Sequence, residues 1–219
     1  MRNLYIPTTV VDGFLDNPDT FRKFALDQEF FIDEKGRFPG SRTSLLSTIS
    51  PVVFDQVCQK ILALFFTNEQ AYSYTIESSF QLVNKNYNTG WVHKDPMIIT
   101  AMLYLTPGSY SGTSLYLKKN ISYNDSNYLN DKVVSYKLGS DDIKACNLHN
   151  QNYEEVMNVK GLYNRLLVFD SNMYHAAHDF FGSSKEDSRL TLVSFVHRLT
   201  GDYYGPLQRS RSVVGQTTL

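Results

Sequence analysis

Residues 91–96, which read WVHKDP, place a histidine and a carboxylate two positions apart. Successive side chains of a β-strand point to opposite faces, so His93 and Asp95 would share one face while Lys94 points away. A third donor, His175, ends the stretch FDSNMYH much later in the chain. Donors from two distant strands come together only if the chain closes over itself, which favours a β-barrel or sandwich.

Two histidines and one carboxylate are the donor set that holds a non-haem Fe(II) ion on one side and leaves positions open on the other. His93, Asp95 and His175 are therefore the predicted metal ligands. His178 follows three residues after His175, so on a continuous strand it faces the other side, and only one of the two binds the ion. Arg189 comes next, in SRLTLVSF. A cation near the metal suggests a co-substrate that carries a carboxylate.

Strand signals dominate the chain from Tyr72 onward, because Tyr, Phe, Val, Ile and Thr are enriched there. The predicted strands are YSYTIESSFQLV (72–83), MIITAMLYL (97–105), TSLYLKK (113–119), LLVFD (166–170) and RLTLVSFVHR (189–198). Before them, residues 4–12 read as a short edge strand with a proline. A first helix starts at Asn17-Pro18, and a second covers roughly 51–66.

Residues 118–160 are polar and rich in Asn, Asp, Ser and Tyr, and they interrupt the strand pattern. We expect an insertion there with a helix near 140–157, serving either as a lid or binding loop or as a solvated excursion. The tail, 201–219, has weak structural signals. With no internal repeat, the whole chain (1–219) is expected to form one domain. Its parts are an N-terminal strand with supporting helices (1–70) and a β core (71–200).

This pattern resembles the Fe(II)/2-oxoglutarate-dependent oxygenases, most closely the prolyl-hydroxylase-like branch, over roughly residues 74–199. The start of the chain, VVDGFLDNPDTFRKFAL and RFPGSRTS, also resembles small bacterial and phage members of that superfamily. The resemblance implies an α+β, mainly β fold. Its core would be a double-stranded β-helix, jelly-roll or cupin-like, with the N-terminal helices packed outside.

The same resemblance assigns Fe(II) to the predicted triad and 2-oxoglutarate to a site beside it. Arg189 matches the basic residue that pairs with the distal carboxylate of 2-oxoglutarate, although Arg165 or Arg198 could take that role. The implied reaction uses O₂ and couples decarboxylation of 2-oxoglutarate, to succinate and CO₂, with hydroxylation of a second substrate. Related halogenases have a small residue in place of the carboxylate, so an intact Asp95 favours hydroxylation.

Four further residues are candidates near this site. Tyr104 matches a tyrosine that hydrogen-bonds the distal carboxylate in prolyl-hydroxylase-like members, or it is a core tyrosine. Thr191, two beyond Arg189, falls where the family often has a hydroxyl residue. Trp91 would share the strand face of the first histidine, and it and Tyr87 either line the substrate pocket or pack structurally.

The prime substrate implied by the resemblance is a peptidyl residue such as proline, a free amino acid or another small molecule. A nucleic-acid oxidative demethylase would need a basic, aromatic-lined surface. The 21 basic and 22 acidic residues give no support for one. Two readings from other classes stay open. One is a non-catalytic jelly-roll binding protein, and the other is a cupin-type enzyme with a different metal and no 2-oxoglutarate.

Composition agrees with a single enzyme-sized domain. A chain of 219 residues that is 42% hydrophobic can bury a substantial core. We expect no membrane span, because no run of eighteen apolar residues occurs, and no signal peptide is evident at the start. Cys58 and Cys146 are the only cysteines. A disulfide scaffold is therefore not expected, and a reducing cytoplasmic location is.

Overall fold

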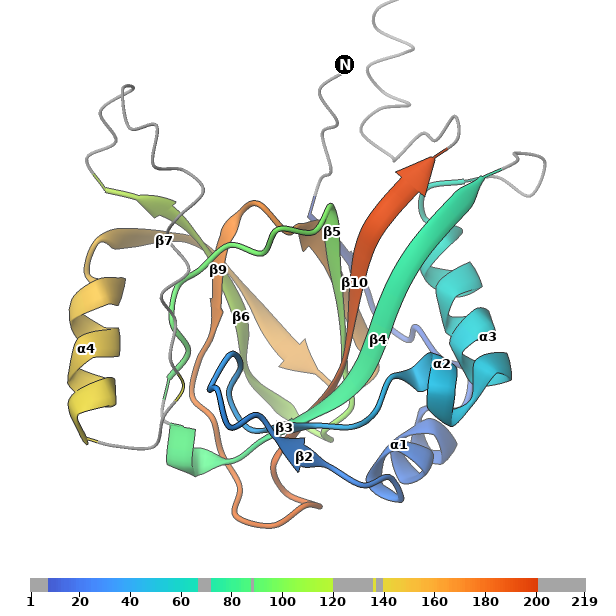
Figure 1. Cartoon of the computed structure of the whole chain (residues 1–219), viewed down its shortest axis with the longest axis horizontal. Helices are drawn as coiled ribbons and strands as arrows, with labels where there is room; N and C mark the ends of the chain where they lie inside the picture. The colour runs from blue at the N-terminus through green and yellow to red at the C-terminus, as the bar shows by residue number, and fades with distance from the viewer. Residues whose placement is uncertain (1–7, 67–71, 88, 120–135, 137–139, 201–219) are drawn as a thin grey trace, which may run out of the picture.

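The computed structural model describes residues 8–66, 72–87, 89–119, 136 and 140–200, and in it two antiparallel sheets face each other (Figure 1). The larger sheet has seven strands in the order β1-β8-β5-β10-β4-β3-β2, and the smaller has three in the order β7-β6-β9. Side chains from both sheets, including Met102, Leu115, Phe169 and Val193, pack in one buried cluster between them. The predicted double-stranded β-helix core is therefore confirmed.

The strands are β1 (Thr9–Val11), β2 (Phe31–Ile32), β3 (Ser41–Arg42), β4 (Ser73–Val83), β5 (Ile99–Tyr104), β6 (Ser109–Lys118), β7 (Tyr153–Leu162), β8 (Arg165–Asp170), β9 (Tyr174–Ala177) and β10 (Arg189–Thr200). The helices are α1 (Pro18–Leu26), α2 (Leu46–Ile49), α3 (Pro51–Leu62) and α4 (Ser140–Asn150), with a 3₁₀ turn, η1 (Lys85–Tyr87).

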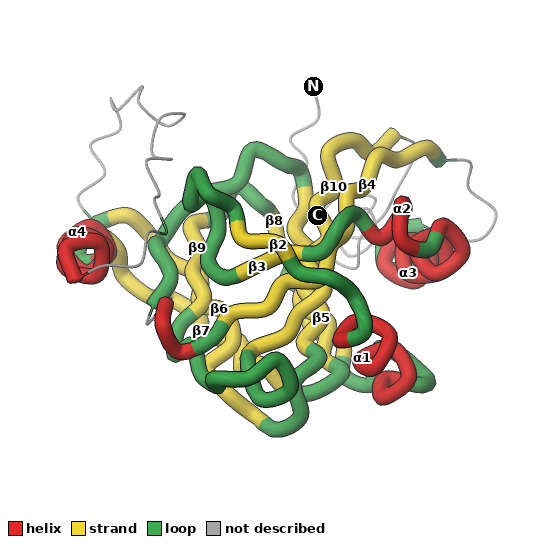
Figure 2. The backbone as a smooth tube through the Cα atoms, turned by 60° about the horizontal axis from the view of Figure 1, so that its bottom comes forward, coloured by secondary structure: helices red, strands yellow, loops and turns green. Residues whose placement is uncertain are grey.

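The larger sheet is buried on both faces, as the alternation along β10 shows. Leu190, Leu192 and Val196 join the cluster that packs beneath the helices, whereas Val193 and Phe195 face the smaller sheet. Figures 1 and 2 show α1 and α3 on the side of the larger sheet that lies away from β6 and β7. The N-terminal helices thus cover the outside of the β core, as predicted.

Local signals set the starts of these helices. Pro18 lies in the first turn of α1 after Asn17. Ser50 caps α3, its side-chain oxygen accepting from Val53 N at 3.4 Å, and Pro51 follows in the first turn. Helix α3 ends at Leu62, short of the expected end near 66.

The predicted helix near 140–157 is correct only as far as Asn150. Tyr153 begins β7, which pairs with β6 from Tyr153↔Lys118 to Leu162↔Ser109. Pairing with the open edge of β6 overrides the local pattern, so the core resumes inside the segment assigned to the insertion. Part of that insertion (120–135 and 137–139), the tail and residues 4–7 of the predicted edge strand lie outside the described residues. The described part of that strand, β1, does lie at the sheet edge.

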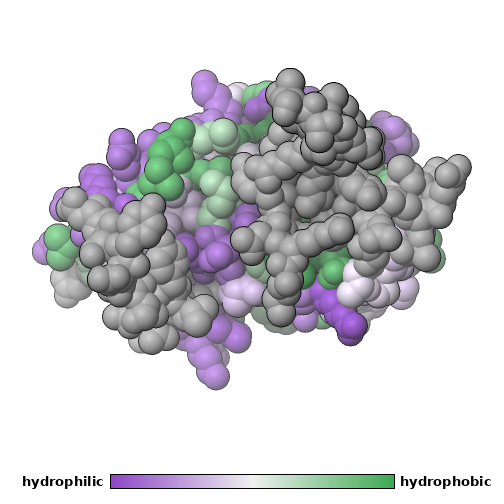
Figure 3. Space-filling view, turned by 90° about the horizontal axis from the view of Figure 1, so that it is seen from above, coloured by the Kyte–Doolittle hydropathy of each residue, from purple (hydrophilic) through white to green (hydrophobic). Residues whose placement is uncertain are grey.

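No helix in the described part of the chain has the length and apolar character needed to cross a membrane. On the face seen from above, hydrophilic side chains are interspersed with hydrophobic ones (Figure 3).

Candidate metal centre

The predicted ligands meet at the edge of the smaller sheet. His93 forms an isolated antiparallel bridge with His175 of β9, through His93 N to His175 O at 3.0 Å and the reverse bond at 2.9 Å. Asp95 N donates to Ser171 O at 2.9 Å, which holds the carboxylate next to the same strand. One donor atom from each of the three ligands lies within 4.8 Å of the others. The structure therefore brings together all three residues that the sequence selects.

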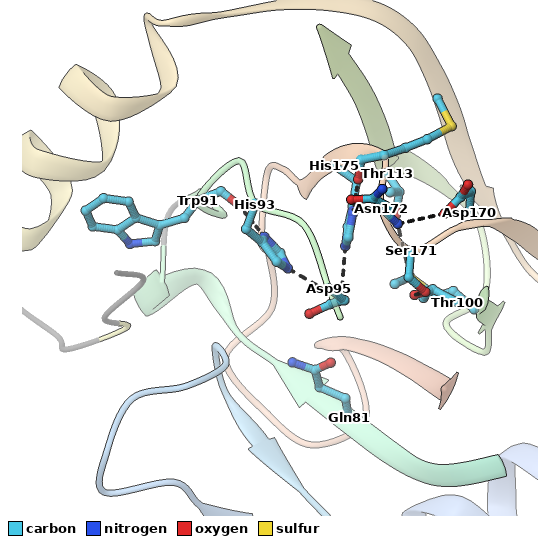
Figure 4. A network of polar contacts seen from close by, with 12 residues as sticks. Gln81, Trp91, His93, Asp95, Thr100, Thr113, Asp170, Ser171, Asn172 and His175 are labelled. Atoms are coloured by element: carbon cyan, nitrogen blue, oxygen red, sulfur yellow. Dashed lines mark hydrogen bonds and ion pairs between the residues drawn. The ribbon is translucent and has the colours of Figure 1, made fainter. Parts of the chain in front are cut away.

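Backbone carbonyls fix the orientation of both imidazoles. His93 Nδ1 lies 2.7 Å from Trp91 O, and His175 Nδ1 lies 2.9 Å from Met173 O. A carbonyl can only accept, so each Nδ1 carries a proton, and in the neutral form of each ring Nε2 is the nitrogen that presents a lone pair. The Nε2 atoms of His93 and His175 lie 3.8 and 3.3 Å from Asp95 Oδ2 (Figure 4). This is how metal-binding histidines are held by outer partners, which the sequence could not name.

The expectation that His93 and Asp95 sit on a regular strand is wrong. Residues 91–95 contain only the single bridge at His93. Pro96 follows directly and has no N–H to continue a ladder. Asp95 converges with the histidines because its own backbone is tied to Ser171 instead.

His178 lies outside the cluster. Strand β9 ends at Ala177, and the His178 ring hydrogen-bonds Thr89 Oγ1 at 3.0 Å and the hydroxyl of Tyr116. Burial lowers its pKa. With both ring nitrogens engaged, His178 is placed as a structural histidine, and it is His175 that faces Asp95.

Arg189 begins β10 and is 2% exposed. Its Nη2 lies 3.1 Å from Met102 Sδ, its Cζ lies 5.6 Å from the Tyr104 ring centroid, and its Nε has no hydrogen-bond partner. Among the described residues no carboxylate forms an ion pair with it. Burying an unpaired guanidinium is costly, so this environment is suited to an anion supplied by a ligand.

The predicted hydroxyl residues lie beside Arg189. Thr191 is the cross-strand partner of Tyr104, and its Oγ1 is buried without a hydrogen-bond partner. The Tyr104 hydroxyl donates to Thr113 Oγ1 at 2.8 Å. Burial raises the pKa of Tyr104, while Arg189 opposes this, so the phenol stays protonated. Thr113 is a neighbour that sequence reasoning missed.

A β-bulge aims Thr113 inward. The β6–β7 register shifts between Tyr110 and Thr113, and Gly112 lies there with φ +73°. A Cβ at Gly112 would lie 2.0 Å from Val159 O, so only glycine fits.

A cavity of about 690 Å³ connects the triad with Arg189. Trp91 and Tyr87, the tentative pocket residues, are not among its described lining. The Trp91 ring packs 5.2 Å from the His149 ring of α4 and points away from the cluster (Figure 4). The structure therefore does not bring the side chains of Trp91 and Tyr87 into the cavity beside the triad.

Two lining residues escaped the sequence analysis. Arg42 on β3 and Gln81 on β4 are cross-strand partners on the far side of the cavity. Arg42 belongs to a strand of only two residues, too short for a pattern to reveal. Gln81 occupies an inward position of β4. A polar residue at an inward strand position is the sequence signal that could have identified it as a cavity residue.

Comparison with solved structures finds the same fold. The chain is similar to HygX from Streptomyces hygroscopicus with nickel, 2-oxoglutarate and hygromycin B bound, at 12% identity and TM-score 0.54 over 86% of this chain and 82% of that chain. It is also similar to AviO1 from Streptomyces viridochromogenes Tue57, at 12% identity and TM-score 0.50 over 87% and 89%. The chain therefore has the fold that its resemblance to Fe(II)/2-oxoglutarate oxygenases implies.

Within that fold class, residues 3–196 match a family model described as a family of unknown function, DUF6445, and the chain belongs to this family. Comparison with curated protein sequences gives no match.

Proposed function

We propose that the protein is an Fe(II)- and 2-oxoglutarate-dependent dioxygenase that hydroxylates a small molecule or a peptidyl residue. The observation that carries this proposal is a single cavity lined both by a two-histidine, one-carboxylate cluster and by the buried, unpaired Arg189. The donor set suits non-haem Fe(II) and leaves coordination positions open. HygX, which shares the fold, has been solved with nickel and 2-oxoglutarate, and this supports the same pairing.

Each residue would have a distinct task. His93 and His175, oriented by backbone carbonyls, and Asp95 would hold the metal ion. Arg189 would pair with the distal carboxylate of 2-oxoglutarate, because a guanidinium offers a bidentate donor fork that is always charged. The hydroxyl of Thr191 would supply a further donor. When bound, the iron and 2-oxoglutarate would supply the oxidising chemistry with O₂ as the oxidant, one oxygen atom entering succinate as CO₂ is lost and the other hydroxylating the second substrate.

Anaerobic titration with Fe(II) and then 2-oxoglutarate tests this proposal. The expected result is the weak visible charge-transfer band of the iron chelate. Binding of Fe(II) without the band would instead indicate a cupin-type metalloenzyme that does not use 2-oxoglutarate. Binding of neither would support the non-catalytic jelly-roll alternative.

A further inference from the structure

The cavity contains a second guanidinium, and it is partly buried. Arg42 of β3 lines the cavity together with the triad and Arg189. Gly40 allows β3 to approach β4 closely, because a Cβ there would lie 2.0 Å from Leu82 O. The chain thus uses a position that only glycine fits to hold Arg42 in the cavity wall.

Arg42 is held by aromatic rings. Its Cζ lies 4.1 Å from the centroid of Phe38 and 5.5 Å from that of Phe195. These cation–π contacts hold the guanidinium in the cavity wall.

The hydrogen bonds of Arg42 are incomplete. Nη2 contacts Gln81 Oε1 at 3.3 Å, and Nε is buried without a partner. Gln81 Nε2 donates to Pro39 O at 2.7 Å, which turns the Gln81 oxygen toward Arg42. Within the described residues no carboxylate forms an ion pair with Arg42. The described side-chain acceptor of Arg42 is thus a neutral amide, while Asp95 and Asp33 act on its charge only from beyond ion-pair distance.

Two further pairs lie among the described charges of the cavity lining. Asp33 pairs with Arg37 at 2.8 Å, and Glu77 lies 3.3 Å from His197, which offsets its charge only when the imidazole is protonated. Under the proposed function, the charges of Fe(II), Asp95, the 2-oxoglutarate dianion and Arg189 cancel. Burial lowers the pKa of Arg42 to about 10, so it remains protonated at neutral pH. Arg42 is therefore a described cation of the lining that is engaged neither by a carboxylate ion pair nor by the proposed iron and 2-oxoglutarate site.

We propose that the prime substrate carries a carboxylate that binds Arg42, attached to an apolar body. This inference rests on the proposed function and specifies its substrate class. A carboxylate matches one planar fork and one positive charge, whereas a phosphate dianion would need more. The apolar body follows from Phe31, Ile32 and Leu45, which line the cavity and are 50%, 71% and 40% exposed.

The test compares matched probes on protein loaded anaerobically with Fe(II) and 2-oxoglutarate. The probes are N-benzoylglycine, longer N-acylglycines and apolar monocarboxylates, each paired with its primary amide, and phenyl phosphate. Binding is measured by calorimetry and by perturbation of the chelate band. We expect the acids to bind the wild type and the amides to bind at least about 10-fold more weakly, since a desolvated charge pair is lost.

The variants separate Arg42 from the co-substrate site. Arg42→Gln should weaken acid binding at least about 10-fold and leave 2-oxoglutarate affinity unchanged. Arg42→Lys keeps the charge but loses the planar donor fork, so its affinity for the acids should lie between those of the wild type and Arg42→Gln. Arg22→Gln serves as the control, because Arg22 is not among the described lining of the cavity and donates to the backbone carbonyl of Glu186 at 2.6 Å, and it should bind the acids like the wild type.

Several results would overturn the inference. These are equal binding of acids and amides, failure of every carboxylate probe, or tighter binding of phenyl phosphate than of the acids. Loss of 2-oxoglutarate binding in Arg42→Gln would instead place Arg42 at the co-substrate. Absence of the chelate band in the wild type would mean that the proposed function itself fails, which the first titration reveals before any probe is added.

Discussion

His93 and His175 face each other across one antiparallel bridge, with reciprocal backbone hydrogen bonds of 3.0 and 2.9 Å and ring centroids 4.4 Å apart. Backbone pairing, rather than contact between side chains, sets the separation of the two imidazoles. The candidate metal site is therefore built into the edge of the smaller sheet, where β9 meets the loop that carries Asp95.

Replacing Asp95 should abolish tight iron binding. Asp95→Ala removes the only carboxylate of the donor cluster, and we expect Fe(II) affinity to fall by more than the ~100-fold that loss of an outer partner can cause. Anaerobic Fe(II) titration of the variant and the wild type measures this, with far-UV circular dichroism confirming the fold.

His178→Ala is the matched control for that experiment. His178 is a nearby histidine that hydrogen-bonds Thr89 and Tyr116 rather than facing Asp95. We expect the Fe(II) affinity of the His178→Ala variant to stay within about threefold of that of the wild type. Comparable iron loss in both variants would show that His175 is not the third ligand.

Arg189→Ala should weaken 2-oxoglutarate binding by at least about 30-fold, because truncating one side of a buried charge pair typically costs about 2 kcal/mol or more. Fe(II) binding should persist. Arg165→Ala is the comparison, since Arg165 is engaged with Asp12 through bonds of 2.5 and 2.8 Å. Calorimetry on Fe(II)-loaded protein measures the 2-oxoglutarate affinity of both variants. Equal affinities in the Arg189 variant and the wild type would refute the co-substrate assignment.

Gly112→Ala should destabilise the protein by about 2–5 kcal/mol, because left-handed backbone strain adds to a clash with Val159 O. Gly13→Ala has a similar φ, +65°, but its Cβ would meet nothing within 4 Å, so we expect a loss of about 1 kcal/mol. Urea unfolding of both variants measures the difference. Equal losses would mean that the close approach at Gly112 contributes nothing.

Acid should destabilise the metal-free protein partly through His178. Burial lowers its folded pKa below 6.5, so the unfolded chain binds more protons between those two values. Stability from this group is fully present above pH 6.5 and is lost as the pH falls toward the folded pKa. Urea unfolding of wild type and His178→Gln between about pH 5 and 8 tests this, and an unchanged pH slope in the variant would contradict it.

The strand segments were predictable because their period-two patterns are local. Arg189, Thr191, Val193 and Phe195 alternate in the sequence, and the structure has all four on the inner face of β10, opposite Leu190 and Leu192. The prediction that a helix extends to about residue 157 was wrong because β7 forms by pairing with β6, and that partner is distant in the sequence. Non-local pairing of this kind leaves little trace in a helix-like composition.

For the candidate site, the sequence by itself determined the donor types and their order: His93, Asp95, His175 and then Arg189. Residue chemistry selects candidate metal ligands and a candidate partner for a carboxylate without any coordinates. Only the tertiary structure decided which histidine faces Asp95, how carbonyls orient the rings and that Arg42 lies across the same cavity. Those features depend on strands closing over one another, so backbone atoms far apart in the chain become neighbours that no local pattern encodes.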